Sequence, residues 1–264
     1  MSDSADADTI NDAIGGSKAP RMAASLTTTI DLLRGVMETT EGDPVWHSIA
    51  EVRELTGADE EALGKLDKKK ELTYDEYTAA ILKMAVLNIG DIDIQATPEA
   101  LDKLILADRD ILFLGLVRAT YGVNKNVRTM CRECSTSNDV VIELDKDFEV
   151  VQPDFDIKEP IVVDTHKGTF NLRLPNNEDI REAGKENTPA ETNTLILSRC
   201  LVWKVSGPQD PIEFVKNLNT GVRRKLLDAL VVDIGPKLQE VDTQCAECGE
   251  EMPLLLDWVS LLFS

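Results

Sequence analysis

Two C-x-x-C motifs contain four of the five cysteines: Cys131 and Cys134 in "TMCRECSTSNDVVIEL", and Cys245 and Cys248 in "TQCAECGEEMPLLLDW". A gap of two residues lets both thiolates of a tight turn bind one ion, so each motif supplies half of a tetrahedral zinc shell. The two halves together make a complete shell of four thiolates. The sequence therefore predicts a structural Zn²⁺ held by Cys131, Cys134, Cys245 and Cys248.

The two motifs have similar surroundings, which favours one shared site. Each lies in a polar turn and precedes an apolar strand candidate, "VVIEL" or "PLLLDW", as in a zinc ribbon built from two knuckles. Gly249 supplies the permissive backbone that such a knuckle favours, while Ser135 takes that place in the first. The 110 residues between Cys134 and Cys245 exceed the roughly 15–20 of a compact site. The ribbon is therefore predicted to be split, at little entropic cost because closure entropy grows slowly with loop length.

Other interpretations of the cysteines stay open. A thioredoxin-like pair needs a C-x-x-C that opens a helix after a strand, whereas both pairs here precede strand candidates. A catalytic zinc needs an open ligand position, which four thiolates would fill. Two pairs without metal, or a thiol oxidoreductase, are further alternatives. Cys200 lies with Ile196 and Trp203 on an apolar helix face, which is typical of a buried core thiol.

The charge of the chain bears on its partners. The net charge is −20, from 48 Asp and Glu against 28 Lys and Arg, which opposes binding to nucleic acid by phosphate neutralisation. The local basic cluster Arg223, Arg224 and Lys225 is interpreted as the solvated face of a helix. A zinc-ribbon nucleic-acid-binding or transcription-related protein is nevertheless the alternative function.

The beginning of the chain is polar and acidic. Residues 1–18, "MSDSADADTINDAIGGSK", hold four Asp and one Lys and no apolar stretch. We expect residues 1–20 to be a disordered acidic tail rather than a secretory signal. The sequence has no apolar run long enough to span a bilayer, so we expect no membrane partner and folding in a reducing cytoplasm.

The N-terminal half is predicted to be mainly helical. The spacing of Leu26, Ile30, Leu33 and Val36 predicts a helix over 21–40, and alternation in "PVWHSIAEVRELTG" predicts an extended segment. "GADEEALGKL" predicts a short helix. A capping box of Thr73 and Glu76 predicts a helix that Gly90 stops. "ATPEALDKLILADRDILFLGLVRATYG" predicts two helical pieces, capped by Thr97 and Asp108, of which the second is buried and ends at 121–122.

The second half begins with a switch to alternating patterns. "NDVVIEL", "EPIVVDT" and "TFNLRLP" predict strands, the last two joined by the turn at 166–168. Helices capped by Thr188 and Asp210 follow, and "GVRRKLLDALVVDIG" predicts a helix ending at 235–236. The fold class is therefore α+β, a mainly helical body with a β-hairpin and strand region and a split zinc ribbon of four cysteines. The expected divisions are 1–20 tail, 21–130 N-terminal helical region, 131–175 first knuckle and strands, 176–240 C-terminal helical region, and 241–264 second knuckle and terminal strand.

Catalytic motifs are missing from the sequence. The chain has only two histidines, neither of which stands in a nucleophile motif. No G-x-S-x-G, Walker loop or H-E-x-x-H is present. We expect a protein that is not an enzyme.

Five stretches, in this order, carry a resemblance to a known family. They are "EVRELTGADEEAL" at 51–63, "LADRDILFLGLVRATYG" at 106–122, "CREC" followed by "VVIEL", "FNLRLPNNEDI" at 170–180, and "CAECG" near an apolar C-terminus. On these motifs the chain resembles the baseplate hub assembly proteins of contractile-tailed bacteriophages. The resemblance implies a non-enzymatic protein that helps to build, or becomes part of, the baseplate hub. Its partners would be other hub or tail proteins, in the host cytoplasm during assembly and then in the virion tail baseplate. The four cysteines fall on the family's paired zinc-knuckle positions.

Overall fold

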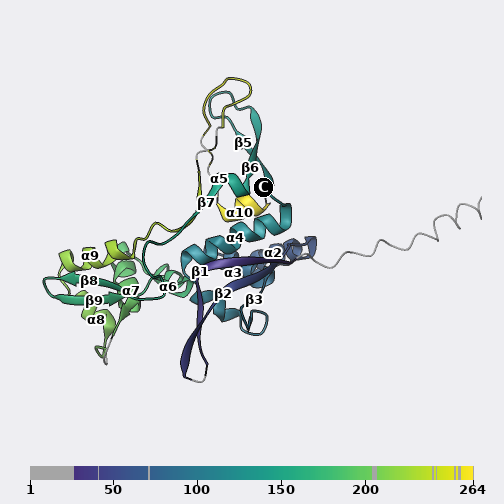
Figure 1. Cartoon of the computed structure of the whole chain (residues 1–264). Coiled ribbons are helices and arrows are strands. Elements are labelled where there is room, and N and C mark those ends of the chain that lie inside the picture. The colour runs from purple at the N-terminus through teal and green to yellow at the C-terminus, as the bar shows by residue number, and fades with distance from the viewer. Residues whose placement is uncertain are drawn as a thin grey trace, which may run out of the picture.

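The chain folds into a body, a projecting arm made of the hairpin 124–143 and the segment 243–252, and a side lobe (Figure 1). A computed structural model describes residues 27–40, 42–70, 72–203, 207–239, 241, 243–252, 254 and 257–263. The predicted tail at 1–20 lies outside these residues. The mixture of helices with separate antiparallel sheets confirms the α+β class.

The body is an antiparallel sheet covered by helices, with strands in the order β1-β2-β3-β4. Its strands are β1 (Thr27–Thr40), β2 (Asp43–Arg53), β3 (Val86–Ile89) and β4 (Ile92–Asp93). Its helices are α2 (Gly57–Lys70), α3 (Tyr74–Ala85), the 3₁₀ helix η1 (Pro98–Lys103), α4 (Leu106–Tyr121) and α10 (Trp258–Phe263). Helix α4 packs on β1 and β2 and is buried at Leu112, Phe113 and Leu116. This apolar helix is therefore the centre of the largest core.

Strand β1 corrects the helix predicted over 21–40. The residues of this stretch that the structure describes, 27–40, form a strand that pairs antiparallel with β2. Ile30, Leu32, Arg34 and Val36 are all buried, which is the two-residue period of a strand. The β-branched run from Thr27 to Ile30 favours this outcome. A 3.6-residue spacing of four apolar residues was therefore a coincidence.

Strand β3 is the second correction. The capping box of Thr73 and Glu76 is confirmed at the start of α3, but the helix ends at Ala85 rather than at Gly90. Val86–Ile89 is a strand that pairs with β2. Gly90 instead opens the turn into β4, with a φ of 57°, and a Cβ there would lie 2.3 Å from the His47 ring. Glycine is thus needed for the turn rather than as a helix stop.

Asp108 has a tertiary role in place of the predicted cap. The N-cap of α4 is Ile105, and neither Ile105 nor Thr97 makes a side-chain cap. The buried Asp108 carboxylate accepts main-chain N–H bonds from Leu33 at 2.6 Å and from Gly35 at 2.8 Å, at the irregularity in β1. Burial raises the pKa of Asp108, while these N–H groups act in the opposite direction. One carboxylate therefore fastens the central helix to the edge strand.

The side lobe is a small sheet with helices around its own core. Its sheet has the order β10-β9-β8, from β8 (Ile161–Thr165), β9 (Gly168–Leu172) and β10 (Leu201–Val202). Its helices are α6 (Asn177–Ala183), α7 (Pro189–Cys200), α8 (Pro211–Lys216) and α9 (Thr220–Leu230). The hairpin of β8 and β9 and the caps at Thr188 and Asp210 are as predicted.

The chain leaves and re-enters the body along one pair of strands. β7 (Phe148–Val151) pairs antiparallel with β11 (Gly235–Leu238), and the short helix α5 (Leu144–Asp147) precedes β7. The helix predicted to run to 235–236 therefore ends at Leu230, and Gly235 begins a strand. β-Branched Val231 and Val232 at the end of α9 favour this stop.

The last segment corrects the predicted terminal strand. After the second cysteine pair, residues 258–263 form helix α10. The Trp258 ring stacks on Phe113 and Phe148, with centroids 6.1 and 5.9 Å apart, so the segment closes the body core. Trp258, Leu261 and Leu262 recur at positions i, i+3 and i+4, which is the spacing of one helix face, and Leu261 and Leu262 are buried. Residues 258–263 are thus a short core helix, and hydrophobicity alone does not distinguish such a helix from a strand. Residues 253, 255 and 256 of the strand candidate "PLLLDW" lie outside the described residues.

Candidate metal centre

The first cysteine pair lies at the tip of a hairpin. β5 (Asn124–Met130), a strand that the sequence reasoning missed, pairs with β6 (Ser137–Glu143), and the turn between them holds Cys131 and Cys134. The N–H of Cys131 donates to the Thr136 carbonyl at 2.9 Å, and the N–H of Ser135 donates to the Cys131 carbonyl at 3.0 Å. Ser135 has a φ of 59°, so a serine adopts the conformation that glycine prefers.

The second pair repeats the first bond for bond. The N–H of Cys245 donates to the Glu250 carbonyl at 2.8 Å, and the N–H of Gly249 donates to the Cys245 carbonyl at 2.9 Å. Gly249 has a φ of 72°. The predicted equivalence of Ser135 and Gly249 is therefore visible in the backbone, and both turns are knuckles of one kind.

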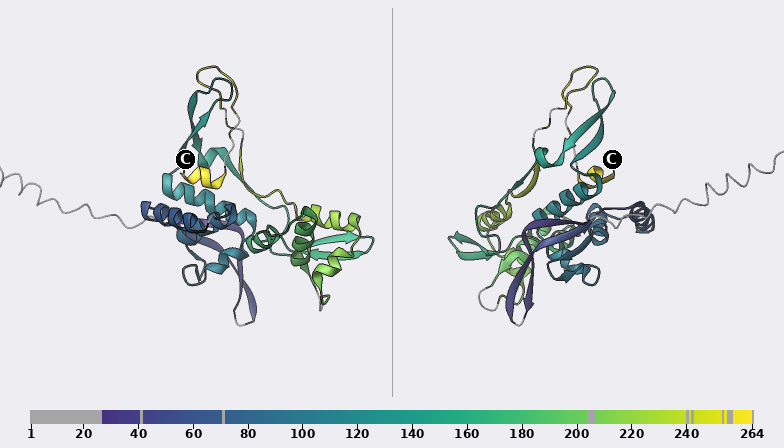
Figure 2. Two further views of the ribbon diagram at one scale, coloured as in Figure 1. Left: turned by 180° about the vertical axis from the view of Figure 1, so that it is seen from behind. Right: turned by 45° about the vertical axis from the view of Figure 1, so that its right-hand side comes forward.

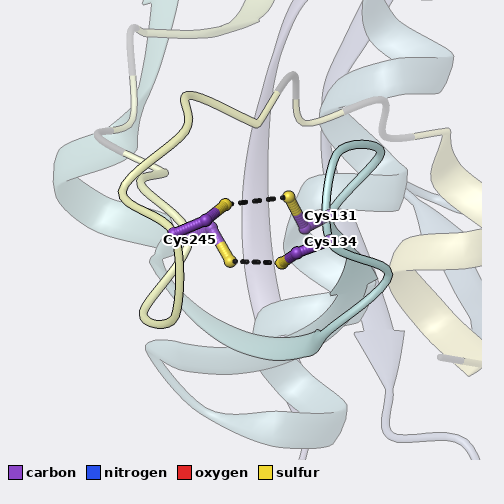
Figure 3. A group of neighbouring side chains, drawn as sticks. Cys131, Cys134 and Cys245 are labelled. Atoms are coloured by element: carbon purple, nitrogen blue, oxygen red, sulfur yellow. Dashed lines mark hydrogen bonds between the residues drawn. The ribbon is translucent and has the colours of Figure 1, made fainter.

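The two knuckles face each other at the end of the arm and bring the predicted sulfurs together (Figure 3). The Sγ atoms of Cys131 and Cys248 are 3.6 Å apart and those of Cys134 and Cys245 are 3.5 Å apart. All four lie within 4.8 Å of one another. A Zn–S length of about 2.3 Å gives a tetrahedron with edges of about 3.8 Å, whereas a disulfide would need about 2.05 Å. The spacing therefore fits four ligands around one ion.

The electrostatics of the cluster also fit a cation. The N–H groups of Cys248 and Glu247 lower the pKa of Cys245 to about 6. The Glu250 N–H favours the thiolate of Cys248, yet the surrounding sulfurs, that of Cys134 first, raise its pKa to about 12. Four crowded sulfurs resist complete ionisation because like charges repel. A divalent cation would remove this conflict, since metal ligation favours the thiolate.

Asn138 joins the two knuckles and was missed by the sequence reasoning. Its side-chain carbonyl accepts the Ala246 N–H at 2.9 Å, and its Nδ2 lies 3.5 Å from the Cys245 Sγ and 3.4 Å from the Met252 Sδ. The residue is buried on β6. Asparagine is uncommon in strands, so its place just after the first knuckle was the signal that could have identified it.

The arrangement suits a structural rather than a catalytic ion. Sulfur fills all four tetrahedral positions, whereas a catalytic zinc site keeps one position open for water or substrate. The small buried cluster of Cys131, Cys245 and Met252 has no other apolar member among the described residues. The residues present therefore fit Zn²⁺ as a cross-link that supports an arm with little core of its own.

Cys200 and the basic cluster lie elsewhere. Cys200 is buried in the side-lobe core, and burial raises the pKa of its thiol to about 12, as expected for an unreactive core residue. Helix α9 carries the basic residues. Arg223 donates to Thr194 at 2.6 Å and Lys225 donates to the Asp164 carbonyl at 2.6 Å. Two of the three cations are thus engaged within the lobe.

Comparison with known proteins identifies the family. Searches of curated proteins and of solved structures gave no match. Among the described residues, no helix combines the length and apolarity needed to cross a bilayer. The family described as T4 bacteriophage base plate protein matches residues 37–263, which cover the body apart from the first part of β1, the whole arm and the side lobe, and include both knuckles. The chain therefore belongs to the T4 bacteriophage base plate protein family, which confirms the resemblance at the level of a phage baseplate protein.

Proposed function

We propose that this baseplate protein is a non-enzymatic component of hub or tail assembly that acts through protein–protein contacts and is stabilised by one structural Zn²⁺. The observation that carries the metal assignment is the convergence of the four predicted sulfurs at 3.5–3.6 Å across two matching knuckles. The proposed ligands are Cys131, Cys134, Cys245 and Cys248.

The family and the surface support the role in assembly. Baseplates are built from protein subunits, and the strong negative charge favours basic protein surfaces over nucleic acid. The arm and the β1–β2 hairpin project from the body in different directions (Figure 2). Such projections are suited to contacts with neighbouring subunits. The protein would meet these hub or tail partners in the host cytoplasm and remain with them in the tail baseplate.

The zinc content of the purified protein tests the proposed metal site. Protein purified from a zinc-supplied host should contain one zinc per chain by inductively coupled plasma analysis. A content well below one per chain would contradict the proposed site. An equal amount of a second metal beside the zinc would contradict the selectivity for zinc that is expected of a shell of four thiolates.

Co-expression with other phage proteins tests the proposed role in assembly. The protein should co-purify with one or more of the hub and tape-measure proteins of the same phage. Absence of any such complex, with every partner soluble, would contradict the role. A gel-shift at low salt separates this role from the alternative, because a zinc-ribbon nucleic-acid-binding protein should give salt-sensitive binding to DNA or RNA.

A further inference from the structure

A cationic pocket of about 280 Å³ lies where the β1–β2 hairpin, the end of η1 and the segments 157–160 and 173–174 meet. Four basic side chains line it, and Glu159 is the acidic lining residue. The basic residues are Arg34, Lys103, Lys158 and Arg173. Because the whole chain carries a charge of −20, this concentration of positive charge is local. Its apolar wall is the junction core around Ile157 and Leu174.

Arg34 is a buried cation with unused hydrogen-bonding capacity. Its side chain is 7% exposed, and its Nη2 donates to the Lys103 carbonyl at 3.1 Å. Its Nε is buried and has no acceptor in the part of the chain that the structure describes. Burial lowers the pKa of Arg34 to about 10. Buried donors normally have a partner, so the fold leaves part of the hydrogen-bonding capacity of Arg34 unused.

The other cations differ in whether they are already paired. Asp179 pairs with Arg173 through two bonds of 2.6 and 3.0 Å and also accepts a bond from Arg199 at 2.6 Å. Lys103 and Lys158 are exposed and have no ion pair among the described residues. Lys158 and Arg34 both lie over the Trp46 ring, 5.9 and 5.8 Å from its centroid. One aromatic ring therefore contacts two cations, and a bound anion would offset their like charges.

The volume of the pocket limits what it holds. The pocket of about 280 Å³ lies just below the roughly 300–1,000 Å³ of pockets for drug-sized ligands, so it has room for one side chain together with part of the peptide that carries it. An acidic side chain has the required parts, a short apolar stem for the wall formed by Trp46 and Leu174 and a carboxylate for the cations. A guanidinium with neighbouring ammonium groups binds a carboxylate through charge-assisted bonds.

We propose that this pocket binds a carboxylate side chain of an acidic peptide segment on a partner protein, with Arg34, Lys103 and Lys158 as the binding groups. This assignment rests on the proposed role in protein–protein assembly, because it names the chemistry of one contact. The body and the segments that flank β8 and β9 together form the site, so a partner seated there would contact the junction between the body and the side lobe.

The test uses the full chain with an end-capped hexaglutamate peptide as probe. The indole signal of Trp46, assigned with Trp203→Phe and Trp258→Phe, should shift saturably in an NMR titration. Capped hexaglutamine should give no shift. Lys158→Glu should weaken binding about tenfold, as expected for loss of one charge-assisted contact. Since the protein as a whole repels a polyanion, saturable binding requires a local site.

Lys83→Glu on α3 is the matched control. Lys83 is exposed, as Lys158 is, but does not line the pocket, so its reversal should leave the affinity unchanged. Equal weakening by both reversals would overturn the proposal, because it would show general charge attraction. No saturable shift, or a shift with inorganic phosphate alone, would also overturn it. The titration contains no phage partner, so its failure alongside intact co-purification would refute the pocket and leave the assembly role standing.

Discussion

Replacement of one cysteine in each knuckle, Cys131→Ser and Cys245→Ser, tests whether the two halves share an ion. Each change replaces a thiolate by a hydroxyl, which is a poor zinc ligand. Structural zinc contributes about 10–16 kcal/mol of apparent binding free energy, or about 3 kcal/mol for each of four sulfurs. Either change should therefore weaken zinc binding by about 100-fold, and by the same amount if the shell is shared.

The structure indicates how much order depends on that ion. The two knuckles together order roughly 16 residues, at about 1 kcal/mol or more of backbone entropy each. Their buried apolar cluster contains Met252 with Cys131 and Cys245, and full burial of a Met contributes only about 1.5–3 kcal/mol. Without the metal, apolar burial cannot hold the knuckles in place. The body has a separate large core, so the loss should be local.

Hydrogen exchange and zinc analysis give the readout. In either variant, peptides covering 131–136 and 243–252 should lose protection, while α4 at 106–121 should keep it. Zinc content after dialysis against a weak chelator should fall in both. Cys200→Ala is the matched control, because it removes a buried thiol from the side lobe and should leave zinc content unchanged. Full zinc and full protection in one of the two knuckle variants would refute a shared shell.

Three further outcomes are expected. Asp108→Asn should cost about 2–3 kcal/mol in urea unfolding, because the amide places a donor against main-chain N–H groups that now bond to a carboxylate; a loss below about 0.5 kcal/mol would contradict its role in fastening β1. Ser135→Gly should remove the strain of a positive φ and so raise the free energy of opening of the first knuckle by about 0.5 kcal/mol, which is measured as slower hydrogen exchange; faster exchange would count against this reasoning. The Arg53 guanidinium holds the pKa of Asp59 well below its usual range, so the pair stabilises the fold above pH about 4 and the gain is lost as pH falls through the depressed value. Asp59→Asn should therefore cost about 2 kcal/mol at pH 7, and this cost should shrink toward pH 2 in chemical denaturation; a cost independent of pH would exclude the ion pair as its source.

The sequence was most informative where a local rule determines the structure. The cap at Thr73, the hairpin turn at 166–168 and the end of α4 at Tyr121 follow from side chains that act on their own backbone. The spacing within each C-x-x-C likewise sets the knuckle turn. That the two knuckles meet could be inferred only from the chemical need for four ligands.

Where tertiary pairing determined the outcome, the sequence reasoning failed. Val86–Ile89 continues a helical pattern but becomes a strand because β2 offers a partner. Asp108 has the position of a cap, yet its acceptors are used by a strand more than 70 residues away. Asn138 has no motif at all, since its role depends on Ala246 and Cys245 being beside it. Such contacts are not encoded in any window of neighbouring residues.

The insertion of the side lobe between the two knuckles sets the order of events during synthesis. A ribosome working at about 5–20 residues per second needs roughly 5 to 20 seconds to make the 110 residues from Cys134 to Cys245. During that interval the first turn is an isolated dithiol, while the whole side lobe emerges between strands β7 and β11, along which the chain leaves and re-enters the body. The four cysteines are consequently brought together late, only after Cys245 and Cys248 have been made. A product truncated before them is left with an open arm and two exposed thiols.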